Sequence, residues 1–64
     1  MVKKMYEDLK GKKVKIVIKE GEEIKTLRGI FLNSEDTTLK IEIGKKINYF
    51  EKQYIIRIRL DEEG

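Results

Sequence analysis

The sequence contains no cysteine and no histidine among its 64 residues. Disulfides and thiolate metal sites are therefore excluded, and a zinc site would need carboxylates alone, which is not how zinc is normally held. The commonest acid–base side chain and the thiol nucleophile of enzymes are also missing. No glycine-rich phosphate loop is present. We therefore expect a protein that acts by binding, with no catalytic residue, no metal and no cofactor.

Long hydrophobic runs are absent as well. No apolar stretch approaches the roughly 20 residues that a membrane span needs, and the opening MVKKMYEDLKGKK lacks the apolar segment of a secretory signal. We expect a soluble, cytoplasmic protein without a membrane partner, in keeping with the missing cysteine. Proline is also absent, and 42% of the residues are charged, mostly lysine and glutamate. This composition is typical of hyperthermophile proteins and suggests a thermophilic source.

The short length limits the core. A chain of 64 residues forms one domain at most and buries only about 60% of the surface that its unfolded form exposes. Small scaffolds usually gain stability from a disulfide, a metal or a partner subunit. Because the first two are excluded, we expect association with other copies of the chain or with another partner.

Alternating apolar residues predict an all-β domain with short connections and hence antiparallel neighbours. A short amphipathic helix is expected over about 2–10, a barrel over about 12–60 and a charged tail over 61–64. Five strands follow from the patterns KKVKIVIKE, IKTLRGIFLN, LKIEI and INYFEKQYIIRIRL, the last interrupted at residues 51–53. The turns between them are EGEE, SEDTT and GKK.

Gly29 stands in the middle of the second expected strand, where a glycine normally weakens the structure. Five short strands can curl into a small, partly open barrel, and such a barrel needs one long strand to bend sharply. We therefore predict the bend at Gly29, with Leu27 and Phe31 facing inward and Ile30 and Leu32 facing outward. The predicted core consists of Leu9, Val14, Ile16, Ile18, Leu27, Phe31, Leu39, Ile41, Ile43, Ile47, Ile56 and Ile58.

This pattern resembles the Sm-like subclass of SH3-like barrels over about residues 3–60. The segments GKKVKIVIK, LRGIF, LKIEI and YIIRIRL follow one another as in that fold, and Leu27, Gly29 and Phe31 resemble the first Sm motif. The acidic turn and the Ile55, Ile58 and Leu60 ending also resemble the C-terminal barrel of the ribosome maturation factor P family. The bacterial Sm-like RNA chaperone is a third relative by pattern. The resemblance implies a five-stranded antiparallel Sm-like barrel with a short N-terminal helix, and assembly as a homo-oligomeric ring through the fourth and fifth strands.

Basic residues on the first and last strands form the first candidate site. If Val14, Ile16 and Ile18 point inward, then Lys13, Lys15 and Lys19 point outward. If Ile56, Ile58 and Leu60 point inward, then Arg57 and Arg59 point outward. In this type of barrel the two strands are neighbours, so the five cations can form one surface for a phosphate backbone. The alternative is a solvated face whose cations pair with nearby acids.

The segment NYFEKQY forms the second candidate site. Phe50 can stack on a base, while Lys52 and Gln53 can reach phosphate and base edges, as in single-strand binding proteins. For Tyr49 and Tyr54 a role as core or subunit contacts is the preferred interpretation. Asn33 and Ser34 can contact a base, but both are also ordinary turn residues.

Together these features predict a small RNA-binding or ribonucleoprotein-associated module that holds single-stranded RNA. One alternative is a protein-docking barrel that binds a peptide or a ribosomal protein by strand addition or through Ile30 and Leu32. Another is a basic architectural DNA-binding barrel. The net charge of only +3 and the absence of tryptophan count against the latter.

Overall fold

The computed structural model describes residues 7–61 and is all-β apart from two single turns of 3₁₀ helix. The expected strands all form, and the break expected at 51–53 lies one residue later, as the second 3₁₀ turn. In chain order the elements are η1 (Glu7–Leu9), β1 (Lys13–Glu20), β2 (Glu23–Ser34), β3 (Thr38–Ile43), β4 (Lys46–Glu51), η2 (Lys52–Tyr54) and β5 (Ile55–Leu60).

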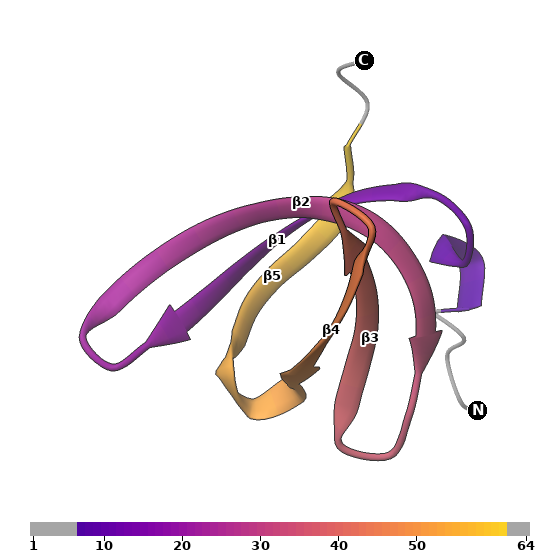
Figure 1. Ribbon diagram of the computed structural model, residues 1–64. Coiled ribbons are helices and arrows are strands. Elements are labelled where there is room, and N and C mark those ends of the chain that lie inside the picture. The colour runs from indigo at the N-terminus through magenta and orange to yellow at the C-terminus, as the bar shows by residue number, and fades with distance from the viewer. Residues whose placement is uncertain (1–6, 62–64) are drawn as a thin grey trace.

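The five strands form one antiparallel sheet in the order β4-β3-β2-β1-β5 (Figure 1). The first and last strands are therefore neighbours, as the resemblance to Sm-like barrels implies. Among residues 7–61 no ladder joins β4 to β5, so these two strands are the edges of the sheet. The sheet is strongly bent, and β2 arches across the whole molecule in Figure 1.

Gly29 lies where β2 changes partners. Residues up to Ile30 pair with β1, whereas Ile30 and the residues after it, except Leu32, pair with β3. A Cβ at position 29 would lie 2.5 Å from the carbonyl oxygen of Glu42 and 2.9 Å from side-chain atoms of both Ile41 and Ile43. The glycine thus allows β3 to approach β2 closely at the point where β2 ends its pairing with β1 and begins its pairing with β3.

Two residues interrupt the ladders. Leu32 has no partner between Phe31, which pairs with Ile41, and Asn33, which pairs with Lys40. Ile56 likewise lies between Ile55 and Arg57, whose partners Ile18 and Val17 are consecutive. A single inserted residue of this kind bends a strand and resets its alternation.

The core lies on the concave side of the sheet. Its buried members are Val14, Ile16, Ile18, Phe31, Leu39 and Ile41, all of them predicted. The partly buried residues that pack against them are Leu9, Leu27, Ile43, Phe50, Ile55 and Ile58.

Two predicted core residues are on the surface. Ile56 is 54% exposed because it is the inserted residue of β5, and Ile55 takes the inward position in its place. Ile47 is 55% exposed because it pairs with Glu42, so that Phe50 rather than Ile47 is the inward-facing apolar residue of β4. Leu60 was also expected to point inward. It pairs with the buried Val14 but remains 40% exposed on the edge strand.

The predicted N-terminal helix lies partly outside the described residues. Its described part is the 3₁₀ turn Glu7–Leu9, not an α-helix that continues to Lys10. Leu9 packs against the core as expected, and its carbonyl accepts a hydrogen bond of 3.0 Å from the Lys12 amide. Gly11, at φ 78°, ends the turn.

Candidate nucleic-acid interface

The convex side of the sheet carries a row of three cations across three strands. Val14, Ile16 and Ile18 are buried, so Lys15 faces the other way, and its cross-strand partners are Arg28 on β2 and Arg59 on β5. Directly opposed residues in antiparallel strands share a face, with Cβ atoms about 4.5–5.5 Å apart. The fold therefore places Arg28, Lys15 and Arg59 side by side.

Further cations lie on the same face, one row away on either side. Lys13 is opposite Ile30, and Arg57 is opposite Val17. Lys19, opposite Ile24, ends the series at the tip of the β1–β2 hairpin. We call this surface the cationic face; its members are Lys13, Lys15, Lys19, Arg28, Arg57 and Arg59. All are exposed except Lys15, which is half-buried between its neighbours.

Arg28 was missed in the sequence analysis, although the sequence contains the information that places it. Gly21 has φ 66° and, with Glu22, makes a two-residue turn between Glu20 and Glu23. A two-residue turn fixes the register of the hairpin. Counting back along both strands from that turn brings Arg28 opposite Lys15.

One carboxylate borders the cationic face. The Asp61 Oδ2 lies 3.5 Å from the Nε of Arg28, and the Asp61 amide donates a hydrogen bond of 2.9 Å to the Lys13 carbonyl. The side chain of Asp61 is only 9% exposed. A shallow hollow of about 310 Å³ lies here, and Glu42 is a second acid at its rim. The end of the face near Lys13 is thus partly neutralised, whereas Arg57 and Arg59 form no ion pair with any of residues 7–61.

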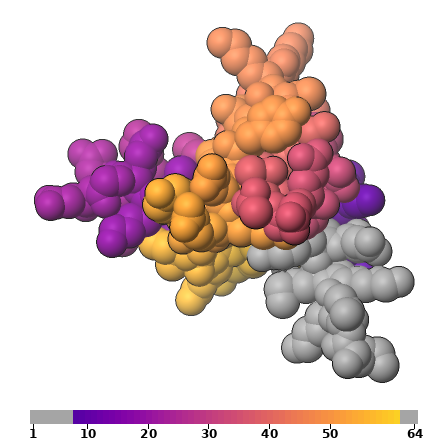
Figure 2. Space-filling view, turned by 90° about the horizontal axis from the view of Figure 1, so that it is seen from below, coloured from indigo at the N-terminus to yellow at the C-terminus, as the bar shows by residue number. Residues whose placement is uncertain are grey.

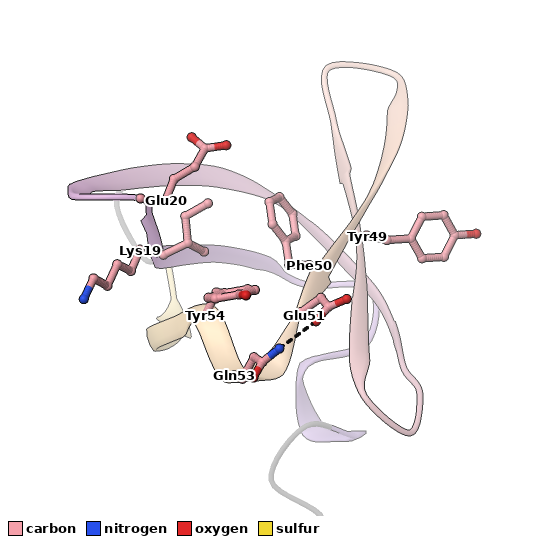
Figure 3. Close-up of a pocket in the computed structure, with 9 residues that line it drawn as sticks. Lys19, Glu20, Tyr49, Phe50, Glu51, Gln53 and Tyr54 are labelled. Atoms are coloured by element: carbon pink, nitrogen blue, oxygen red, sulfur yellow. Dashed lines mark hydrogen bonds between the residues drawn. The ribbon is translucent and has the colours of Figure 1, made fainter.

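The end of β4 and the η2 turn form a separate site. They line one side of an open groove of about 830 Å³, whose opposite wall is the end of β1 with its turn, residues 18–21 (Figure 3). The residues on the first side are Tyr49, Phe50, Glu51, Gln53 and Tyr54. Figure 2 shows the tip of this hairpin, in purple, standing out from the body of the molecule. The Nε2 of Gln53 donates a hydrogen bond of 3.0 Å to Oε1 of Glu51.

The aromatic residues of this segment differ from the expectation. Phe50 packs against the core, whereas Tyr49 and Tyr54 are 60% and 53% exposed. The two tyrosines are therefore not core residues, and a role as subunit contacts stays a prediction. In Figure 3, Tyr49 points away from the groove, and the Nζ of Lys40 lies 5.6 Å from the centre of its ring. Tyr54 is thus the exposed aromatic side chain that remains at the groove.

Other predicted residues lie apart from both sites. Asn33 and Ser34 are half-buried at the end of β2, opposite Lys40 and Leu39, and not in the turn. Lys52 belongs to η2 and is half-buried; its amide donates a hydrogen bond of 2.8 Å to the Thr37 carbonyl.

Comparisons with protein-family models, with curated proteins and with solved structures give no match. Over residues 7–61, no helix has the length and apolar character needed to cross a membrane. In the same part of the chain, no three acidic side chains are grouped so that they could hold a metal ion. The arrangement of charge on the surface is therefore the strongest functional signal of the described chain.

Proposed function

We propose that the protein is a small Sm-like barrel that binds single-stranded RNA and performs no catalysis. The bend of β2 at Gly29, the adjacency of β1 and β5 and the single five-stranded antiparallel sheet support this type of fold. A cysteine-free chain of this kind would act in the cytoplasm.

The row Arg28, Lys15 and Arg59 is the observation that carries the proposal. Like charges directly opposite each other in a sheet destabilise it, so this arrangement costs folding stability in the free protein. A phosphate backbone laid along β1 and β5 would relieve the repulsion and release counterions. Along each strand, alternate residues are about 6.6 Å apart, which gives Arg57 and Arg59 a regular spacing for successive phosphates.

Lys15→Gln and Arg59→Gln test the proposal, with Lys46→Gln as the matched control. Lys46 is an equally charged, exposed residue at the start of β4; its cross-strand partner Ile43 packs against the core, so Lys46 lies on the opposite side of the sheet from the cationic face. Binding is measured by fluorescence anisotropy with a labelled uridine oligonucleotide of about 10 nucleotides, over a range of salt concentrations. Each face variant should weaken binding and reduce the log–log salt slope by about 0.7, while the control should change neither quantity by more than a small amount.

Thermal unfolding of the same variants separates binding from folding. Because Lys15 and Arg59 repel each other, replacing either should leave the melting temperature unchanged or raise it. Equal losses of affinity in all three variants would contradict the proposal, as would binding that is indifferent to salt. Tighter binding to duplex DNA than to the single strand would favour the architectural alternative.

A second candidate function is docking of a protein partner, including another copy of the chain. The edge strands β4 and β5 leave backbone groups available for strand addition. Ile47 and Tyr49 on β4, and Ile56 and Leu60 on β5, are large apolar side chains that are 40–60% exposed. Pairing of β4 with β5 of the next copy would cover both edges and, repeated, would form a ring. Native mass measurement tests this; a monomer at micromolar concentration would contradict it.

A further inference from the structure

The groove beside η2 combines an apolar base with an exposed aromatic ring. Ile18, at 8% exposure, and Phe50 belong to the core and lie at the bottom, while Tyr54 is 53% exposed. Tyr54 lies beside the end of β1 because the next residue, Ile55, pairs with Ile18. β1 and β4 are not neighbours in the sheet, so the bend of the sheet brings Phe50 to the same groove. A flat aromatic ring beside apolar surface is the kind of site on which an unstacked nucleobase is held.

The polar groups of the groove are mainly hydrogen-bond acceptors. Glu20 and Glu51 are both exposed at its rim. Glu20 is already paired with Lys25 at 2.6 Å, but Glu51 accepts only the 3.0 Å bond from Gln53 among the hydrogen bonds described for its side chain. A carboxylate has about four lone-pair sites, so Glu51 can accept more hydrogen bonds. Its charge would repel a phosphate, so the groove favours a neutral ligand that donates hydrogen bonds.

We propose that this groove is a nucleobase pocket that selects guanine over uracil, with the base stacked on Tyr54 and its N1–H and N2–H groups donated to the Glu51 carboxylate. This rests on the proposed RNA-binding function and adds base recognition to it. Two adjacent donors match a carboxylate in the same bidentate way as a guanidinium does. Uracil instead presents one N–H between two carbonyl oxygens, which the carboxylate repels.

Lys19 connects the groove with the cationic face. By register it shares the outer surface with Lys15, and it also borders the groove. The four steps along the strand from Lys15 to Lys19 span about 13 Å, which is a short distance for an extended single strand. One RNA segment can therefore contact the cationic face with its backbone and place a neighbouring base beside Tyr54. Gln53 is a positioning residue in this arrangement, because its hydrogen bond orients the Glu51 carboxylate.

The test compares two labelled oligonucleotides of about 10 nucleotides, one all uridine and one with a single central guanosine, on four proteins. Wild type should bind the guanosine oligonucleotide about tenfold more tightly, as expected for one good bidentate base contact. Glu51→Gln should abolish this ratio without weakening binding to the uridine oligonucleotide. Tyr54→Leu should weaken binding of the guanosine oligonucleotide several-fold, whereas Tyr54→Phe, which keeps the ring, should retain the preference.

The outcomes distinguish the pocket from the proposed function. If wild type binds the guanosine and uridine oligonucleotides equally tightly, and binding still depends on salt, the guanine pocket is refuted but RNA binding by the cationic face is not. A preference that survives in Glu51→Gln would also overturn the pocket. Failure to bind either oligonucleotide would overturn the RNA-binding function and the pocket together. Glu51 and Tyr54 are exposed, so these variants should fold, and matching circular dichroism and melting curves verify that they do.

Discussion

Replacing Gly29 with alanine should destabilise the fold strongly, although alanine is normally the better residue in a regular strand. The added Cβ would lie 2.5 Å from the Glu42 carbonyl oxygen and 2.9 Å from each of the Ile41 and Ile43 side chains. The nearest of these atoms belongs to the backbone of β3, which cannot turn aside as a flexible side chain can. Relief therefore requires β2 and β3 to separate at the bend.

The size of the effect follows from two opposing contributions. Overpacking of a well-packed interior typically costs about 1–3 kcal/mol, while alanine for glycine gains about 0.4–1 kcal/mol through the unfolded state. Because the contact is with backbone, we expect a net loss of about 2 kcal/mol. A chain of 64 residues has a total stability of about 3–10 kcal/mol. The melting temperature should therefore fall by roughly 8–16 °C.

Urea unfolding followed by circular dichroism measures this change, and Gly21→Ala is the control. Gly21 has φ 66°, and a Cβ added there would meet no other atom within 4 Å, so alanine should cost only the left-handed backbone penalty of about 1–2 kcal/mol. A Gly29→Ala protein as stable as wild type would refute the close approach of β3. Gly29, unlike Gly21, does not have a positive φ, so the left-handed backbone penalty does not apply at position 29 and a loss of stability there reports the contact with β3.

Three further changes test other features. Ile55→Ala should lower stability by about 1–3 kcal/mol because Ile55 packs on the core, whereas Ile56→Ala should change it by less than about 0.5 kcal/mol; equal effects in denaturant unfolding would contradict the inserted residue in β5. Lys45→Gly should raise the melting temperature by a few degrees, because Lys45 has φ 78° in the β3–β4 turn, and a lower value would show that its side chain contributes there. Asp61→Asn should tighten oligonucleotide binding at low salt, because it removes the carboxylate beside Arg28, and weaker binding would argue that the ion pair positions that arginine.

Much of the fold is readable from alternation and turn chemistry. The patterns around Val14, Ile16 and Ile18 and around Leu39 and Ile41 identify the buried faces of β1 and β3 correctly. The glycine in β2 indicates the bend because no regular strand benefits from one there. The cations of β1 and β5 share a face as predicted, because these strands pair and β1 has a clear alternation.

The errors arise where alternation is ambiguous. In β4, one face carries Ile47 and Tyr49 and the other carries Asn48 and Phe50. Each face thus has one apolar residue and one with a polar group, so composition does not decide which face is buried. The turn does decide, because Gly44 and Lys45 form a two-residue loop that pairs Ile43 with Lys46 and hence Leu39 with Phe50. In β5, four of the six residues are large and apolar. An inserted residue in such a run cannot be recognised from the alternation of apolar and polar residues.

The groove could be assembled from the sequence only in part. Tyr54 directly precedes Ile55, which pairs with Ile18, so the expected pairing of β1 with β5 places Tyr54 beside the end of β1. Phe50 and Glu51 belong to β4, which does not pair with β1, and the curvature of the sheet brings them to the groove. Local patterns report which side of a strand is buried, but they do not report how far a sheet curls. The segment NYFEKQY was recognised as a candidate, whereas its facing wall was not.

The pairing of Lys15 with Arg59 joins positions from opposite ends of the chain. Such distant contacts form late in folding, because a long loop must close before they contribute. While the polypeptide emerges from the ribosome, β1 to β4 can pair in sequence order, but the cationic face lacks Arg57 and Arg59 until β5 has emerged. The row of Arg28, Lys15 and Arg59 is therefore one of the last parts of the sheet to be assembled during synthesis.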